Sequence, residues 1–201
     1  GAFSGVILIY LVFFAVAGNS GMFTAEGAVN ILSVAAEIGI IAATVSLLMI
    51  AGEFDLSIGS MIGFAGIVIG LGTTVYGLPL SASVLIALVV CGMIGAANGY
   101  VTVKTGLPSF IVTLASMLML RGLSIAGTRY INGYTQISKI TESDPESPMI
   151  ALFAGRVGEG FFRWMADVGW IGTKANGLPV VEGLQVSILW WAGLTAVATW
   201  I

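Results

Sequence analysis

The chain has no histidine, a single cysteine and few charged side chains. The absence of histidine argues against a conventional zinc site, and the lone Cys91 rules out a disulfide framework. Charged residues make up only 8% of the sequence, whereas about a quarter is usual in a soluble domain. Such a chain cannot cover a water-facing surface with charge. Its net charge of −3 also argues against nucleic acid as a partner.

Hydrophobic residues make up 58% of the sequence, and the mean hydropathy is +1.05. A helix that spans a membrane needs about 20 mainly apolar residues. The runs that predict spanning helices are Ala2–Ala17, Ala28–Gly52, Ile58–Val75, Leu80–Val103, Ser109–Gly127 and a last run from Leu184 to Ile201. We therefore expect an all-α, polytopic transmembrane bundle with about six helices. Because the chain starts without Met and stops inside an apolar run, we interpret it as a fragment of one larger membrane domain.

The charges are concentrated in one segment. Eleven of them lie between Thr128 and Gly183, which we predict to be a long polar extracytoplasmic loop between residues 1–127, the first five helices, and residues 184–201, the start of the next. The amphipathic stretch Phe161–Met165 suits lipid headgroups, where Trp is favoured, and a lid or docking surface is the alternative.

Two of the apolar runs carry glycine at helical spacing. The glycines that share a face are Gly59, Gly63, Gly66 and Gly70 in the third run and Gly92, Gly95 and Gly99 in the fourth. Lipid supplies no hydrophobic drive between helices, so helices in membranes commonly pack over small residues. This pattern predicts helix packing rather than direct contact with a substrate.

Ionisable residues at membrane depth are costly and tend to mark a pathway or a partner. The segment from Ile38 to Ala51 covers roughly 21 Å as a helix, which is less than the hydrocarbon thickness of about 30 Å. Either Glu37 or the polar segment Glu53–Ser57 therefore lies below the headgroups, and the spacing does not choose between them. Arg121 can reach an interface, pair with Glu37 or Asp55, or line a pore.

The segment Glu53–Ser57 has two interpretations. Asp55 or Ser57 before an apolar run is a good helix N-cap, which predicts a capped turn between two helices. Alternatively, a broken helix exposes polar groups to a solute pathway, as in many transporters. Its carboxylates, hydroxyl and backbone N–H groups suit a neutral polyol such as a sugar.

Four motifs resemble one family. The run Gly52–Ser60 resembles the G-G-I-D-L-S-V-G-S signature of ribose/xylose-type monosaccharide ABC transporter permeases, which are related to branched-chain amino-acid ABC permeases. The other three are Asn98-Gly99, Pro108–Leu114 (family P-x-F-I-V-T-L) and Met119–Gly122 (family Y/L-R-G). All occur in the family's order and spacing from about Asn30 to Gly127. The sequence departs from the family at Glu53-Phe54, which replaces G-I, and at Lys139–Val181, which is longer than expected.

The resemblance implies a permease subunit of an ABC importer that carries a monosaccharide or related polyol across the cytoplasmic membrane. It implies a second permease subunit as a homodimer partner, cytoplasmic ATP-binding subunits that hydrolyse ATP, and an extracytoplasmic solute-binding protein. We expect neither enzymatic activity nor a cofactor or metal in this chain. The residues proposed for the substrate pathway are Glu53, Asp55, Ser57, Gly59, Asn98, Thr113 and Arg121.

The resemblance also implies an orientation, with the N-terminus inside. Helix alternation then places Gly18–Gly27, Gly72–Pro79 and the long loop outside, and Glu53–Asp55 and Lys104 toward the cytoplasm. The basic residues of the loop run against the positive-inside rule, but that rule works poorly for long loops. The segment that receives the ATPase is expected beyond Ile201.

Three other classes remain to be weighed. An ion- or proton-coupled secondary transporter could use Glu37, Asp55 and Arg121 as a relay. An intramembrane enzyme needs a nucleophile with a base or a metal cluster, and the sequence offers neither convincingly. A membrane scaffold without transport leaves the ordered polar motifs without a reason.

Overall fold

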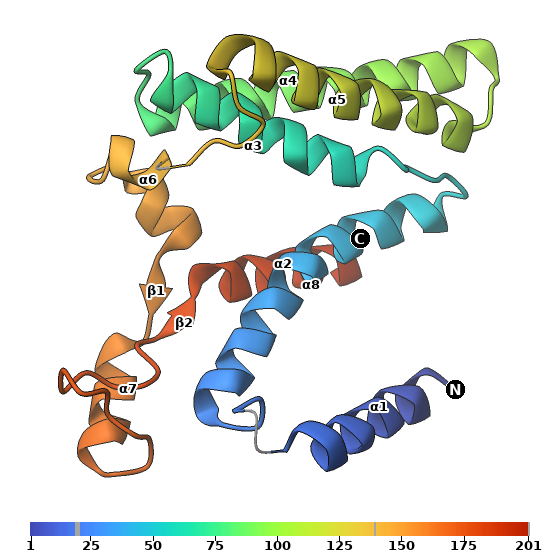
Figure 1. Ribbon diagram of the computed structural model, residues 1–201. Helices are drawn as coiled ribbons and strands as arrows, with labels where there is room; N and C mark the ends of the chain where they lie inside the picture. Colours follow the sequence, from blue (N-terminus) through green and yellow to red (C-terminus); the bar gives the residue numbers. More distant parts are fainter. Residues whose placement is uncertain (19–20, 139, 201) are drawn as a thin grey trace. The chain divides into compact units, whose positions relative to one another are not determined.

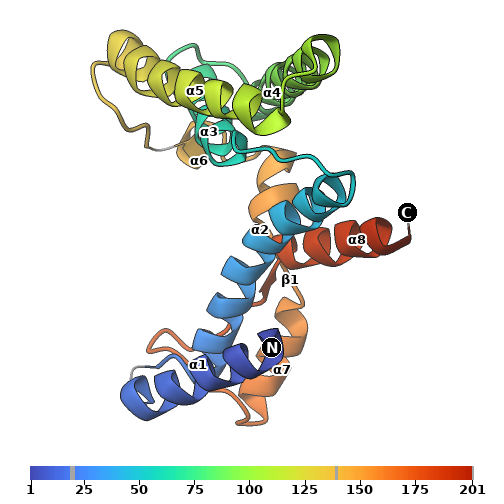
Figure 2. The ribbon, with the colours of Figure 1, turned by 90° about the vertical axis from the view of Figure 1, so that its right-hand side faces the viewer.

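The structure is a computed structural model that describes residues 1–18, 21–138 and 140–200. The chain forms two compact units, which we treat separately. One consists of Gly1–Ala42 with Phe153–Ile201, and the other of Ala43–Leu152. Figures 1 and 2 show the helices of each unit from two directions.

The unit Ala43–Leu152 is built around three helices that contact one another (Figure 1). Its elements are the end of α2 (Ala25–Ile50), α3 (Ile58–Thr74), α4 (Leu80–Thr105), α5 (Ser109–Asn132), α6 (Ile140–Ser143) and the start of the π-helix η1 (Ile150–Ala154). Prolines at 79 and 108 precede α4 and α5, where the missing N–H costs nothing. Gly106, with φ of 69°, ends α4 in a left-handed conformation that favours glycine.

The other unit joins four helices and a short strand pair. Its elements are α1 (Ala2–Ala17), most of α2, β1 (Arg156–Val157), α7 (Glu159–Asp167), β2 (Leu184–Gln185) and α8 (Val186–Trp200). The strands are antiparallel, with Arg156 opposite Gln185. On α2, Gly39 lies against the indole of Trp191 so closely that a Cβ would overlap the ring. A glycine is therefore required where α2 and α8 meet.

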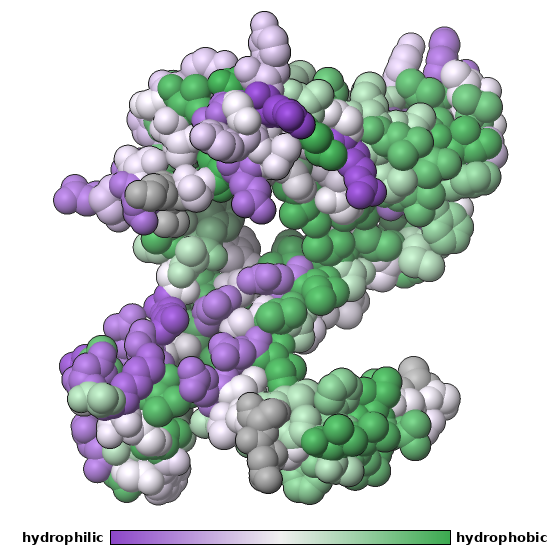
Figure 3. Space-filling model, viewed as in Figure 1, coloured by the Kyte–Doolittle hydropathy of each residue, from purple (hydrophilic) through white to green (hydrophobic). Residues whose placement is uncertain are grey.

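The predicted all-α membrane fold is confirmed. Among the described residues, α2, α4 and α5 are long and apolar enough to cross a membrane, and α1, α3 and α8 are shorter apolar helices. Most large apolar side chains are exposed, and the side chains of Val103 and Ile50 are 86% and 82% accessible. On the face shown in Figure 3, hydrophobic residues cover α1, whereas hydrophilic residues gather around β1 and α7. Exposed apolar surface on this scale suits lipid rather than water.

Several predicted boundaries differ from the structure. Helix α2 occupies Ala25–Ile50 instead of Ala28–Gly52, and α4 continues past Val103 to Thr105. Helix α5 continues past Gly127 to Asn132, so the segment predicted as a loop begins with helix. That segment also contains α6, η1, β1 and α7. Its polar composition was a sign of exposure, and it did not exclude local helical structure.

Candidate functional site

The polar segment Glu53–Ser57 is held by the first turns of α5. The backbone N–H of Phe54 donates to Ser109 Oγ at 3.0 Å, and the N–H of Leu56 donates to Thr113 Oγ1 at 3.1 Å. Gly52, with φ of 82°, turns the chain out of α2 just before this segment. Backbone groups that have left helical geometry need such partners in a membrane, because lipid supplies none.

Asp55 organises the start of α3. Its Oδ1 accepts the backbone N–H of Ser57 at 2.7 Å and the hydroxyl of Ser57 at 2.6 Å. Ser57 is fully buried and occupies the N-cap position, as expected, but its side chain caps no helix N–H. The capped-turn interpretation accounts for these contacts, with Asp55 rather than Ser57 supplying the acceptor. The role of the segment in a solute pathway stays a prediction.

A second polar pair lies between α4 and α5. The hydroxyl of Ser116 donates to Oδ1 of Asn98 at 2.5 Å, and both side chains are buried. Within the part of the chain that the structure describes, Nδ2 of Asn98 has no hydrogen-bond partner. A buried amide N–H without a partner is uncommon and marks a place where a polar group can bind.

The structure brings some of the predicted pathway residues together and separates others. Ser57 bonds to Asp55, and Thr113 bonds to the backbone of Leu56 in the same segment, whereas Asn98 bonds to Ser116. Glu53 is partly buried, and Gly59 and Arg121 are exposed. The structure describes both Arg121 and Asp55, and no ion pair joins them.

Two residues of this site, Ser109 and Ser116, were missed from the sequence. Together with Thr113 they follow i, i+4, i+7 spacing on the otherwise apolar helix α5. Residues at this spacing share one helix face. A polar stripe on an apolar helix was therefore the available signal.

The predicted packing glycines fall into two groups. Gly70 is buried, and a Cβ there would lie 2.9 Å from Cγ2 of Ile137. The glycines whose added Cβ would meet nothing within 4 Å are Gly59, Gly63, Gly66, Gly92, Gly95 and Gly99. For these six, packing stays a prediction. A close contact that the pattern did not identify is Gly72, where a Cβ would lie 2.5 Å from Ser83 Oγ.

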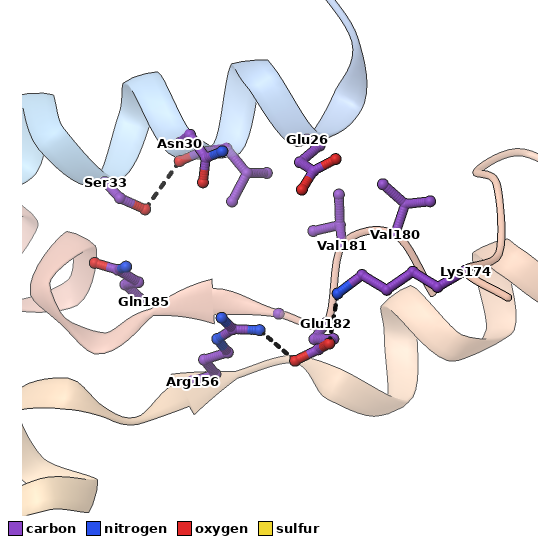
Figure 4. A pocket seen from close by; sticks show the side chains of 11 residues that line it. Glu26, Asn30, Ser33, Arg156, Lys174, Val180, Val181, Glu182 and Gln185 are labelled. Carbon is purple, nitrogen blue, oxygen red and sulfur yellow. Dashed lines mark hydrogen bonds and ion pairs between the residues drawn. The ribbon is translucent and has the colours of Figure 1, made fainter. Parts of the chain in front are cut away.

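A small charged cavity of about 80 Å³ lies where α2 faces the segment around β1 and β2 (Figure 4). Glu182 binds Lys174 at 2.7 Å and Arg156 at 2.5 Å, while Glu26 and Asn30 come from α2. The Lys174 ammonium, which hydrogen-bonds to Glu182, lowers the pKa of that carboxyl, and Arg156 acts in the same direction. Among the described residues, no group of three or more metal-ligating His, Cys, Asp or Glu side chains is present.

Comparison with known proteins identifies related chains. Residues 27–201 match the family described as branched-chain amino acid transport system / permease component. The chain is 36% identical over 168 residues to the xylose transport system permease protein XylH of Escherichia coli (strain K12), which covers 82% of this chain and 41% of that protein. It is 31% identical over 127 residues to the ribose import permease protein RbsC of the same strain, covering 62% and 38%.

A further relative is the fructose import permease protein FrcC of Rhizobium meliloti, 33% identical over 109 residues, covering 54% of this chain and 30% of that protein. The chain thus spans about two fifths of the length of the xylose permease it matches, 41%. No solved structure matches the chain.

Proposed function

Because the chain belongs to the branched-chain amino acid transport system / permease component family, we propose that it is part of the membrane-spanning permease subunit of an ABC importer. The cargo is a monosaccharide or related polyol, and the membrane is the cytoplasmic one. The observation that carries this proposal is the identity of 36%, over 82% of the chain, to a permease named for xylose transport. The polar segment held against α5 supports the proposal. Polar and ionisable groups inside a membrane are energetically unfavourable, and they tend to mark the path of a substrate.

The proposed subunit works with other chains. A second copy completes the permease, cytoplasmic ATP-binding subunits hydrolyse ATP, and an extracytoplasmic solute-binding protein delivers the sugar. This chain supplies the pathway and no chemical step, so we propose no cofactor for it. Family membership favours this mechanism over the ion- or proton-coupled alternative.

The proposed mechanism is alternating access between the helices. In the unit Ala43–Leu152, α3 contacts both α4 and α5. The polar segment at the start of α3 bonds to Ser109 and Thr113 of α5, so rocking of α5 against α3 moves that segment. The unpaired amide N–H of Asn98, between α4 and α5, is a candidate donor to a sugar hydroxyl.

A transport assay tests this function. The complete gene is expressed with its neighbouring ATP-binding and solute-binding proteins, and uptake of labelled D-xylose, D-ribose and D-fructose into proteoliposomes is followed. We expect uptake of at least one sugar that requires hydrolysable ATP and persists with an uncoupler. Uptake that collapses with the uncoupler while ATP is maintained would establish the secondary-transport alternative instead.

The pathway role of the polar segment is tested by Asp55→Ala. We expect this variant to insert normally and to lose uptake, since Ser57 loses its acceptor and the pathway loses a carboxylate. The control is Asp167→Ala, in an exposed aspartate outside that segment, which should transport normally. Full transport by Asp55→Ala would show that the segment serves only as a turn between helices and has no role in the pathway.

A further inference from the structure

A second cavity lies at the C-terminal end of α3, opposite the end that follows the polar segment Glu53–Ser57. It is an open cavity of about 500 Å³ between Thr74, the last residue of α3, and the chain that follows α5. Figure 1 shows this segment, coloured gold, passing beside α3 on its way to α6. Its volume lies in the range of about 300–1,000 Å³ that is usual for small-molecule sites. The cavity therefore has room for a monosaccharide.

The described residues that line this cavity are polar except for Ile137, and none of them is charged. Asn132 and Gln136 contribute amides, Thr74, Thr135 and Ser138 contribute hydroxyls, and Tyr134 contributes an aromatic ring. Among the described residues, the side chains of Asn132 and Gln136 have no hydrogen-bond partner, so their donors and acceptors are available to a ligand. Amides both donate and accept, as sugar hydroxyls do.

The aromatic ring supplies the second element that a sugar needs. The side chain of Tyr134 is 74% accessible, so its ring face is open beside the cavity. An aromatic ring combines a large apolar face with a hydroxyl that can hydrogen-bond. A sugar ring presents C–H groups on its faces and hydroxyls at its edge, which matches this pairing. An ionic ligand finds no counter-charge in this lining.

The cavity wall is fixed to α3. Ile137 packs against Gly70, where an added Cβ would lie only 2.9 Å from Cγ2 of Ile137. Gly133, with φ of 75°, turns the chain sharply at the end of α5. A site whose walls are held by such contacts loses less freedom when a ligand binds.

We propose that this cavity is a binding site for a neutral monosaccharide at the extracytoplasmic end of the permease. The proposal rests on the proposed transport function and its orientation. The 17 residues of α3 separate the cavity from the polar segment at Glu53–Ser57, and a helix of this length spans about 25 Å. Polar groups at both ends of one helix then provide separate points for receiving and releasing the sugar.

Direct binding tests the proposal. The complete permease is placed in lipid nanodiscs without the solute-binding protein, and its affinity for D-xylose, D-ribose and D-fructose is measured by saturation-transfer NMR. We expect Tyr134→Ala and Gln136→Ala each to weaken sugar binding by about five- to tenfold. The matched control is Tyr130→Ala, because the side chain of Tyr130 is 92% accessible and lies outside the cavity lining. The thermal midpoint of each variant establishes that it is folded.

The same variants are then measured for ATP-dependent uptake in the assembled transporter. Reduced uptake by Tyr134→Ala and Gln136→Ala, with normal uptake by Tyr130→Ala, supports the site. Transport by the unsubstituted protein together with unchanged sugar binding in both variants overturns the site and leaves the transport function standing. Weaker binding of the solute-binding protein with unchanged sugar binding identifies a protein-docking surface and likewise overturns the site. Absence of uptake of all three sugars by the unsubstituted transporter overturns the transport function and this inference with it.

Discussion

The hydroxyl of Thr113 accepts the backbone N–H of Leu56 at 3.1 Å, across 57 positions of the sequence. This bond ties the break between α2 and α3 to the body of α5. A backbone N–H in lipid has no water molecule to hydrogen-bond with, and leaving it without a partner costs several kcal/mol. The break between the two helices therefore depends on a third helix.

We predict that Thr113→Val destabilises the protein. Valine keeps the shape of threonine but cannot accept the part-buried N–H of Leu56, and a donor left without a partner away from water costs about 1–3 kcal/mol. The expected result is a lower midpoint of thermal unfolding in detergent, with reduced sugar uptake.

The matched control for this variant is Thr102→Val. Among the residues that the structure describes, the hydroxyl of Thr102 bonds only to the carbonyl oxygen of Asn98, four residues earlier in the same helix. We expect a much smaller change for this variant. Equal midpoints for the two valine variants would contradict the role given to Thr113.

We predict that Gly72→Ala loosens the packing of α3 on α4. A Cβ at this position would lie 2.5 Å from Oγ and 3.0 Å from Cβ of Ser83, so one of the helices must shift. Overpacking of this kind costs about 1–3 kcal/mol. The thermal midpoint in detergent measures the effect. In the control Gly127→Ala, on α5, the added Cβ meets nothing within 4 Å, and the midpoint should be unchanged or higher.

We predict a pH-dependent contribution from the ion pairs of Glu182. The folded pKa of this carboxyl lies below its ordinary value of 4.5 because of Lys174 and Arg156. The stabilisation is therefore present above that ordinary value and is lost as the pH falls through the lowered folded pKa.

The measurement compares the thermal midpoints of Glu182→Gln and the unsubstituted protein. A small decrease is expected near pH 7, because exposed ion pairs contribute little, and it should disappear below the folded pKa and shrink in about 1 M salt. The control is Glu146→Gln, in an exposed glutamate that takes no part in the ion pairs of Glu182 with Arg156 and Lys174. A decrease that is independent of pH would contradict the electrostatic explanation.

We predict the orientation from the family resemblance. An alkaline phosphatase fusion after Ser143 should be active, since that residue belongs to the proposed extracytoplasmic segment. A fusion after Thr105, at the end of α4, should be inactive because the orientation places it in the cytoplasm. The reverse pattern would invert the topology and move the proposed sugar site to the cytoplasmic side.

The sequence was sufficient for much of the fold. The apolar runs predicted α1 through α5 and α8, because length and hydrophobicity are local properties of a spanning helix. It was less successful for the segment after Gly127, where short elements form in a polar context. It also named Asp55, Ser57 and Thr113 among seven residues proposed for the substrate pathway. The structure bonds Ser57 to Asp55 and bonds Thr113 to the backbone of Leu56 between them, while the pathway role itself stays a prediction.

By itself, the sequence determined that this chain belongs in a bilayer, because so few charged residues cannot cover a surface in water. Only the tertiary structure decided which polar groups meet. Ser116 and Asn98 lie 18 positions apart, and Leu56 and Thr113 lie 57 apart. Such pairs depend on how helices pack, and no local pattern encodes that arrangement. The cavity beside Tyr134 has the same origin, since packing of Ile137 on Gly70 brings the chain after α5 to the end of α3.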